Sequence, residues 1–302
     1  MELNSLTFRL RAGGLFLLAL FVFVVTELLA TMIAATLNRL FTGTASPSSR
    51  LAFESLYRPT HLLLVTIAFS GLLQFERPPQ PALAGQGLPL GRTGLKHFSS
   101  GCAIGCGLVS FAVLAIKLFG GLHFAPANTP ATLTLTATFL VLWVLLAAAM
   151  LEEVVFRGYP FQRLIDAIGP IAATALLSLF FGAVHLRNPG ATWLGALNTV
   201  LVGVLFSLAY LRTKALWLPF GIHFAWNATM GLLFGLPVSG FTLFSVLWQG
   251  APMGPTWLTG GAYGIEASFT GTAVILLGIG ILTLVPSQKM SDSNGDSAHL
   301  NE

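Results

Sequence analysis

Two adjacent glutamates, Glu152 and Glu153, stand at the end of an apolar run and are followed by Arg157. Residues four apart share a helix face, so Glu153 and Arg157 are predicted to form an ion pair. Glu152 points about 100° away on the same helix, which leaves its carboxylate free. Repulsion between two neighbouring carboxylates raises the pKa of one of them. That group can then hold a proton near neutral pH, as a general acid or base must. The pattern therefore favours acid–base chemistry, although it also fits an ion pair that ends a membrane helix.

Two histidines and an asparagine lie in other apolar runs. His185 closes the stretch that begins at Phe181, and His223 precedes Asn227 by four residues on one helix face. Polar side chains inside a membrane helix face protein or water rather than lipid. Imidazole and amide groups can donate to a developing oxyanion, which is worth about 3–4 kcal/mol per donor. The alternative is a structural role in hydrogen bonding between helices.

Equal spacing predicts that these clusters meet. Glu152 lies about 17 residues before the expected turn at Gly169 and Pro170, and His185 lies about 15 residues after it. At 1.5 Å per helical residue the two arms have nearly equal length, so Glu152 and His185 would reach similar depths. His223 is expected about 13 Å inside the cytoplasmic face. We expect all three clusters to meet inside the membrane.

The composition indicates an integral membrane protein. Of 302 residues, 55% are hydrophobic and 9% are charged, whereas soluble proteins carry about 25% charged residues. The mean hydropathy is +0.80. These values exclude a disordered chain, a fibrous protein and an ordinary cytosolic enzyme, and they predict an all-α polytopic bundle. The net charge of +4 comes from scattered residues and does not indicate a nucleic-acid partner.

Apolar runs predict the helices that must position the site. A hydrocarbon core about 30 Å thick requires about 20 helical residues, and about eight crossings are predicted over 13–37, 57–75, 101–122, 131–151, 170–186, 191–211, 215–235 and 265–286. The first run is too long for a signal peptide and lacks a cleavage site, so it is interpreted as a retained helix. Its Glu27 is expected to line the cavity or to pair with a neighbour. A helix over 131–167 exceeds one crossing and must project or bend near Gly158 and Pro160.

Lys and Arg predict the orientation. With the N-terminus in the cytoplasm, ten assigned basic residues lie inside and four outside, as the positive-inside rule requires. Both termini are therefore expected to be cytoplasmic, and we expect a bacterial plasma membrane. The segment 76–100 is interpreted as a cytoplasmic loop and 236–262 as an ordered interfacial loop.

The predicted helices and loops divide the chain into three regions. Residues 1–130 hold the N-terminal membrane helices and a loop, 131–286 the catalytic bundle, and 287–302 a disordered tail. The tail is polar and small, a composition that cannot bury enough apolar surface to fold.

The three clusters together resemble a known family. Glu-Glu-x-x-x-Arg at 152–157, Phe-x-x-x-His at 181–185 and His-x-x-x-Asn at 223–227 occur in this order. They are similar to the three motifs of the CAAX protease and bacteriocin-processing family (CPBP, or Abi), over about residues 130–235. The resemblance implies an intramembrane endopeptidase with eight helices. It also implies a peptide or membrane-protein substrate in the bilayer, for example a prenylated or bacteriocin-like peptide.

The resemblance also implies roles for individual residues. Glu152 matches the glutamate that activates water, and His185 matches the histidine that helps to hold or activate that water. His223 and Asn227 match the pair around the scissile carbonyl, while Glu153 and Arg157 fill the remaining motif positions. No motif position departs from the family pattern.

The sequence leaves two mechanisms open. There is no His-Glu-x-x-His zinc signature, yet His185, His223 and Glu152 could supply a two-histidine, one-carboxylate zinc site. The family has been described both as metalloprotease and as metal-independent glutamate protease. The arginine-paired carboxylates favour the metal-free mechanism. A covalent nucleophile is not expected, because neither Cys102 nor Cys106 has a nearby base.

Two other classes of protein fit parts of the pattern. A non-enzymatic membrane partner, such as an immunity-type or scaffold protein, would keep a buried polar cluster but is expected to show degenerate motifs. A transporter or proton relay also uses intramembrane acids and histidines. It would be expected to show broken helices in two symmetric halves, whereas the polar residues here concentrate in one part of the chain.

Overall fold

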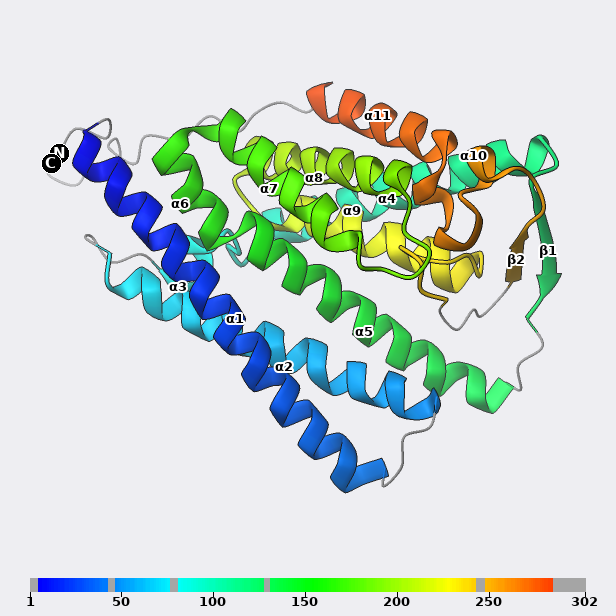
Figure 1. The fold of residues 1–302 in the computed structure, drawn as a ribbon, viewed down its shortest axis with the longest axis horizontal. Coiled ribbons are helices and arrows are strands. Elements are labelled where there is room, and N and C mark those ends of the chain that lie inside the picture. Colours follow the sequence, from blue (N-terminus) through cyan, green and yellow to red (C-terminus); the bar gives the residue numbers. More distant parts are fainter. Residues whose placement is uncertain (1–4, 43–46, 77–80, 128–130, 243–247, 285–302) are drawn as a thin grey trace, which may run out of the picture.

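The computed structural model describes residues 5–42, 47–76, 81–127, 131–242 and 248–284. The predicted all-α class is confirmed (Figure 1). The principal helices are α1 (Leu6–Thr42), α2 (Pro47–Gln74), α4 (Arg92–Leu118), α5 (Ala131–Arg157), α6 (Tyr159–Ile168), α7 (Pro170–His185), α8 (Trp193–Thr213), α9 (Trp217–Ala228) and α11 (Phe269–Leu284). The predicted disordered tail, 287–302, lies outside the described residues.

Among the described residues, five helical segments are long and apolar enough to cross a bilayer, and one of them runs through both α5 and α6. They comprise Leu6–Phe41, Arg50–Gln74, Arg92–Leu118, Leu135–Ile168 and Trp193–Thr213. The helices α7 and α11 are apolar but have only 16 residues each. Every predicted apolar run corresponds to a helix, and the chain is an integral membrane protein. The number of eight crossings stays a prediction.

The helices pack in two groups on either side of α5 (Figure 1). On one side, α1 and α2 pack against each other, and they contact α6 and α5 respectively. On the other side lie α4, α7, α8, α9 and α11, with α4 lying along α9 and α7 along α8. Buried apolar residues such as Phe69, Phe161 and Phe181 form a continuous core between the groups. The end of α5 therefore lies between the groups.

Glycines allow α4 and α9 to approach closely. A Cβ atom on Gly101 or Gly105 would fall inside contact distance of the Leu218 or Ile222 carbonyl oxygen on α9. Gly221 of α9 is equally close to the main chain of α4. Small residues at such contacts are typical of membrane helix pairs. The spacing Gly101-x-x-x-Gly105 thus fixes α9, and with it His223, against α4 within one chain.

Gly105→Val is expected to lower the free energy of unfolding by about 1–3 kcal/mol, because the added side chain overpacks the α4–α9 contact. The matched control is Gly107→Val on the same helix, where nothing lies within 4 Å of the position of an added Cβ atom. Thermal unfolding in mild detergent measures both variants. Equal unfolding temperatures for the two would contradict this account of the contact.

Two predicted boundaries were wrong. The segment 76–100 is not a loop throughout, because it contains the short helix α3 (Ala82–Gly85) and the start of α4 at Arg92. That start is too polar to register as an apolar run, but contact with α9 keeps it helical. The second helix begins ten residues before the predicted start at 57. Arg58 does not end it, because Glu54 accepts a hydrogen bond from Arg58 Nε at 2.8 Å one turn earlier.

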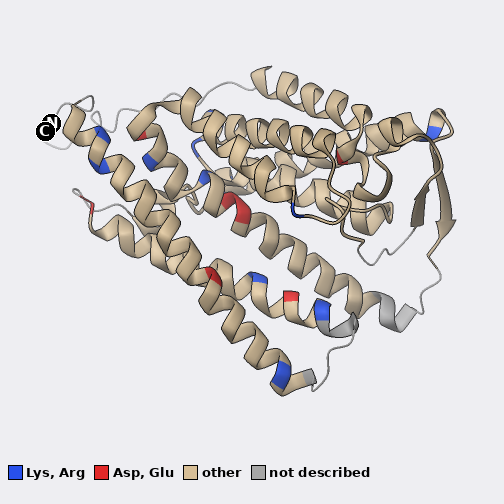
Figure 2. Ribbon diagram, viewed as in Figure 1, with Lys and Arg blue, Asp and Glu red and all other residues tan. Residues whose placement is uncertain are grey.

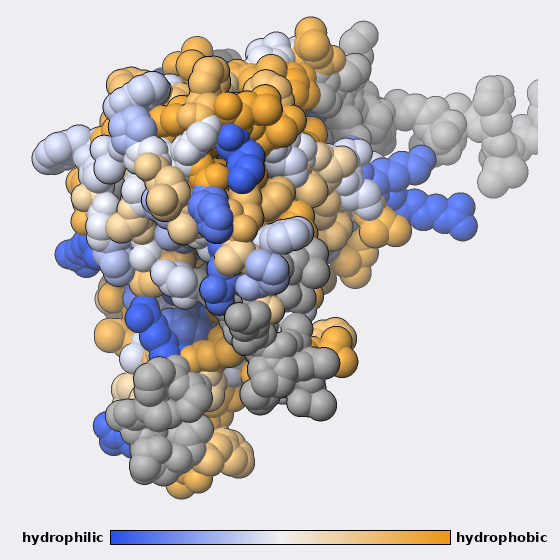
Figure 3. All heavy atoms as spheres, turned by 90° about the vertical axis from the view of Figure 1, so that its right-hand side faces the viewer, coloured by the Kyte–Doolittle hydropathy of each residue, from blue (hydrophilic) through white to orange (hydrophobic). Residues whose placement is uncertain are grey.

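A small sheet was not predicted. The strand β1 (Leu122–Pro126) pairs antiparallel with β2 (Trp248–Pro252), which lies in the predicted interfacial loop 236–262. Short helical turns, including α10 (Thr256–Thr259) and 3₁₀ turns at Gly261–Tyr263 and Ile265–Ala267, complete this ordered region. Figure 3 views the end of the molecule that carries the strands, and there polar and apolar residues are mixed. Such a surface suits the boundary between membrane and water.

The predicted bend after the glutamates is confirmed. Gly158 breaks the helix between α5 and α6, and Pro160 follows in the first turn of α6, where proline is well tolerated. The predicted turn at Gly169 and Pro170 is also present, with Gly169 at φ +84° and Pro170 beginning α7. These two breaks let α5, α6 and α7 fold back on one another.

Candidate active site

The predicted ion pair between Glu153 and Arg157 is confirmed at the end of α5. Arg157 Nη1 lies 3.3 Å from Glu153 Oε1, and both side chains are at most 1% exposed. Figure 2 shows this acidic stretch in the middle of the molecule, away from the basic residues where α1 begins. A pair so deeply buried is strongly destabilised when one partner is removed.

Arg157 also contacts two neighbouring helices. Its Nη2 donates to the carbonyl oxygen of Gly203 on α8 at 3.1 Å. Its guanidinium lies over the rings of Phe181 and Phe206, at 4.7 and 5.2 Å from the ring centroids. Cation–π contact and a main-chain acceptor compensate for the loss of water around the guanidinium. Arg157 therefore joins α5, α7 and α8 at one point.

His223 completes the buried cluster from α9. Its Nδ1 lies 2.9 Å from Glu153 Oε1, and because a carboxylate accepts, Nδ1 donates. Phe206 stacks on the imidazole with centroids 4.9 Å apart. The hydrogen bond fixes the ring orientation and leaves Nε2 to accept a proton or, in the imidazolium, to donate one. The sequence did not indicate that Glu153 would contact His223 as well as Arg157.

Glu152 is the less constrained carboxylate, as its helix position predicted. Its side chain is 28% exposed, and its Oε2 lies 3.8 Å from His223 Nε2, beyond hydrogen-bond distance. Oε2 itself is buried and has no hydrogen-bond partner among the described residues. A buried, unpartnered carboxylate oxygen beside an imidazole is well placed to take a proton.

His185 occupies the end of α7 and is partly buried. Its Nδ1 lies 2.7 Å from the carbonyl oxygen of Phe181, so Nδ1 donates and Nε2 of the neutral ring can accept. The imidazole also contacts the Phe181 ring, at 4.5 Å between centroids. Phe181 in turn lies under Arg157, which places His185 beside the cluster without a direct hydrogen bond to Glu152. The first and third motifs are thus in direct contact. The second motif reaches the cluster through Phe181.

Asn227 lies one turn beyond His223 on α9 and is partly buried. The helix continues directly into a π-helical turn at Thr229–Leu233, a feature frequent at functional sites.

The predicted zinc ligands His185, His223 and Glu152 do not form a three-ligand set. Within the part of the chain that the structure describes, no group of three or more His, Cys, Asp or Glu side chains is arranged to hold a metal ion. One nitrogen of each histidine is already directed to a protein oxygen.

Sequence reasoning missed Glu266, in the 3₁₀ turn before α11. Its carboxylate is buried and accepts hydrogen bonds from Trp226 Nε1 at 3.2 Å and from the main-chain nitrogen and hydroxyl of Ser239 at 2.5 and 2.9 Å. An acid that follows a loop without Lys or Arg, at the start of an apolar run, was the available signal.

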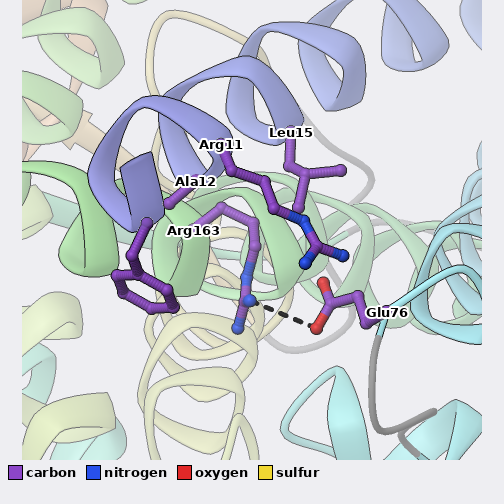
Figure 4. A pocket seen from close by; sticks show the side chains of 6 residues that line it. Arg11, Ala12, Leu15, Glu76 and Arg163 are labelled. Carbon is purple, nitrogen blue, oxygen red and sulfur yellow. Dashed lines mark hydrogen bonds and ion pairs between the residues drawn. The ribbon is translucent and has the colours of Figure 1, made fainter. Parts of the chain in front are cut away.

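A small pocket forms where α1, α6 and the end of α2 meet (Figure 4). Phe8, Arg11, Ala12, Leu15, Glu76 and Arg163 line it. Arg163 pairs there with Glu76 at 3.2 Å and with Asp166 at 3.1 Å. The first pair connects α6 to the end of α2, whereas the second lies within α6. No predicted site residue lines the pocket.

Comparison with known proteins supports the motif assignment. Residues 134–229 match the family described as type II CAAX prenyl endopeptidase Rce1-like. No curated protein and no solved structure matches the chain. The matched segment covers nearly all of α5 and the whole of α6, α7, α8 and α9, and so it includes all six predicted site residues. Residues 134–229 of this integral membrane protein are thus similar to the type II CAAX prenyl endopeptidase Rce1-like family, and this similarity supports an intramembrane protease kind of function.

Proposed function

We propose that this protein is an intramembrane endopeptidase that hydrolyses a peptide bond through a water molecule activated by Glu152. The observation that carries the proposal is the buried, unpartnered Oε2 of Glu152, which faces His223 beside the Glu153–Arg157 pair. The substrate is a peptide or membrane protein that reaches the site from the bilayer. A prenylated C-terminal peptide is the substrate class that we propose to test first.

Each side chain has a role in the proposed reaction. Glu152 accepts one proton from water as the water oxygen bonds to the scissile carbonyl carbon, and His223 and Asn227 donate to the oxyanion. The carbon–nitrogen bond then breaks, and the proton held by Glu152 passes to the leaving nitrogen. His185 holds the water through Nε2 and assists this transfer. Glu153 orients His223, and Arg157 orients Glu153.

We propose the metal-independent form of this reaction. Arg157 already balances the charge of the buried Glu153 carboxylate, so this carboxylate has no need of a metal for charge balance.

Localisation is part of the proposal. Basic residues gather where α1 begins (Figure 2), and α11 runs back towards that end of the bundle (Figure 1). We propose a bacterial plasma membrane with this end, and both termini, in the cytoplasm.

A cleavage assay tests the function. Purified protein is incubated with membrane-tethered peptides, including prenylated C-terminal peptides and leader-type peptides, and products are identified by mass spectrometry. His223→Gln is expected to remove cleavage, because it removes the group that joins Glu153 to the reacting carbonyl. The control is His61→Gln on α2, a buried histidine that contacts Thr26 at 3.4 Å. Equal cleavage by both variants would contradict the proposed site.

Chelators are expected to leave cleavage unchanged. Elemental analysis of the purified protein should give well below one zinc per chain, and 1,10-phenanthroline should not slow the reaction. One zinc per chain, together with chelator-sensitive cleavage restored by added zinc, would instead establish the zinc-dependent alternative.

A further inference from the structure

The pocket between α1, α6 and the end of α2 takes no part in the proposed reaction. One face of α1 supplies Arg11 and three apolar side chains to its lining, at three- and four-residue spacing. Arg163 of α6 and Glu76, two residues beyond the end of α2, complete the lining. Apolar groups and charges of both signs therefore surround one small cavity.

Polar groups in this lining have unused hydrogen-bonding capacity. Glu76 is 8% exposed, and its Oε2 pairs with Arg163 Nη1 at 3.2 Å, while its buried Oε1 has no hydrogen-bond partner among the described residues. Nε of Arg163 is also buried without such a partner. Arg11 belongs to none of the ion pairs between described residues. Buried polar atoms are normally satisfied, so one acceptor and two cationic donors here call for a ligand.

The charges at the pocket indicate the kind of ligand. Arg163 pairs with Asp166 at 3.1 Å as well as with Glu76, so two arginines and two carboxylates make a neutral cluster. Figure 4 shows the guanidinium groups of Arg11 and Arg163 pointing towards Glu76 from α1 and α6. An anion alone or a cation alone would leave this half-buried cluster with an uncompensated charge. A zwitterion preserves the balance, with its anionic group at Arg11 and its cationic group at Glu76.

The position of the pocket matches the level of lipid headgroups. Around it, at the start of α1, Arg9 and Arg11 are exposed, and Leu6 and Leu10 are 73% and 66% exposed. Basic residues gather at this end of the molecule (Figure 2). Arginine beside exposed leucine is typical of the boundary between hydrocarbon and headgroups, where the guanidinium reaches out to phosphate. The chemistry of the cluster and its position thus agree on a zwitterionic headgroup.

We propose that this pocket binds a phosphoethanolamine group, and that a membrane phospholipid is its source. Arg11 and Nε of Arg163 donate to the phosphate oxygens, and the ammonium donates to Oε1 of Glu76. Phe8 and Leu15 contact the apolar part of the lipid. The bound lipid joins α1 to α6 and to the end of α2. This binding does not depend on peptide cleavage.

Lipid titration followed by native mass spectrometry tests the proposal. The full-length protein, freed of lipid in mild detergent, is titrated with phosphatidylethanolamine, phosphatidylcholine and phosphatidylglycerol that carry identical acyl chains. We expect one phosphatidylethanolamine to bind about tenfold more tightly than either other lipid, because phosphatidylcholine has no N–H donor for Glu76 and phosphatidylglycerol has no cation. Equal affinity for the three lipids would overturn the proposal.

The phosphate contact is tested by Arg11→Gln, which breaks no ion pair between described residues. It should weaken the binding of phosphatidylethanolamine about tenfold. The matched control is Arg9→Gln, which removes an exposed arginine two residues earlier that does not line the pocket. We expect the control to stay within about twofold of the parent. Equal weakening by both variants would reveal only general attraction between basic residues and lipid, against the proposed site.

The ammonium contact is tested by Glu76→Gln, which should bring the affinities for phosphatidylethanolamine and phosphatidylcholine within about twofold of each other. Asp166→Asn is its control, because Asp166 also pairs with Arg163 but does not line the pocket. This variant should keep the preference for phosphatidylethanolamine. A preference that survives Glu76→Gln, or that is lost equally in both variants, would contradict the assigned role of Glu76.

Free O-phosphoethanolamine distinguishes a lipid from a soluble ligand. We expect it to compete with phosphatidylethanolamine but to bind at least about tenfold more weakly, because it lacks the apolar part that contacts Phe8 and Leu15. Binding of the free compound as tightly as the lipid would assign the pocket to a soluble ligand and overturn the lipid as its source.

Discussion

Glu152→Gln lowers the rate of peptide cleavage by about 10²–10⁴-fold, the usual loss when a general base is removed. The amide keeps the size of the side chain but cannot accept the water proton. Cleavage is measured as kcat/KM on the peptide that the parent cleaves best. The loss should lie in kcat, because Glu152 acts in the transition state rather than in ground-state binding.

The same substitution should leave stability unchanged. The buried oxygen of Glu152 makes no hydrogen bond among the described residues, and its side chain is 28% exposed. Replacing the charge also removes repulsion from neighbouring Glu153. We therefore expect a thermal unfolding temperature within about 2 °C of the parent or above it.

Glu152→Asp is the informative control. It keeps the carboxylate but withdraws it by one methylene, and displacements of about 1 Å can cost about 10²-fold in rate. A low but measurable activity is expected. Full activity of Glu152→Gln would show that another group activates the water and would reject the proposed role.

Arg157→Ala should produce the largest loss of stability, about 3–5 kcal/mol. It leaves Glu153 as a buried carboxylate with His223 as its remaining partner, and it removes the contacts with Gly203, Phe181 and Phe206. Unfolding in detergent, by heat or by denaturant titration, measures the change. Cleavage should be lost as well, because His223 is then no longer held in place.

A matched ion pair on α2 tests whether burial causes this loss of stability. Arg58 and Glu54 have the same four-residue spacing, but their side chains are 31% and 26% exposed. Arg58→Ala should cost less than about 1 kcal/mol. Similar losses for the two arginine variants would mean that the burial of the α5 pair is not the source of the stability.

Removing both members of the Glu153–Arg157 pair tests stability separately from activity. The double variant Glu153→Leu with Arg157→Met exchanges the pair for apolar side chains of similar size, which is often neutral or stabilising. We expect it to recover more than half of the stability lost in Arg157→Ala, while cleavage stays absent. Recovery of cleavage would show that the pair does not orient His223.

Much of this protein could be predicted from local sequence. The apolar runs located the membrane helices, and the four-residue spacing predicted the pair between Glu153 and Arg157. Gly158, Gly169 and Pro170 marked the breaks that turn the chain back on itself. These predictions succeed because helix geometry fixes the relation between residues within one or two turns.

Relations between helices needed the tertiary structure. The sequence placed His223 opposite the carboxylates but did not indicate which one it contacts, and only the packed structure brings Nδ1 to Glu153. It also placed His185 at the correct end of α7 without revealing that Phe181 lies between it and the ion pair. Such contacts depend on the rotation and tilt of each helix, which distant residues such as Gly101 and Gly105 determine.

The amino-acid sequence by itself determined an all-helical membrane protein, the resemblance to the CAAX protease family and the six side chains that define its motifs. The tertiary structure alone decided that Glu153 joins Arg157 to His223, that β1 pairs with β2, and that Glu266 is buried against Trp226 and Ser239. The physical reason is that local periodicity specifies which face of a helix is polar. Close packing against a neighbour specifies which atoms meet there.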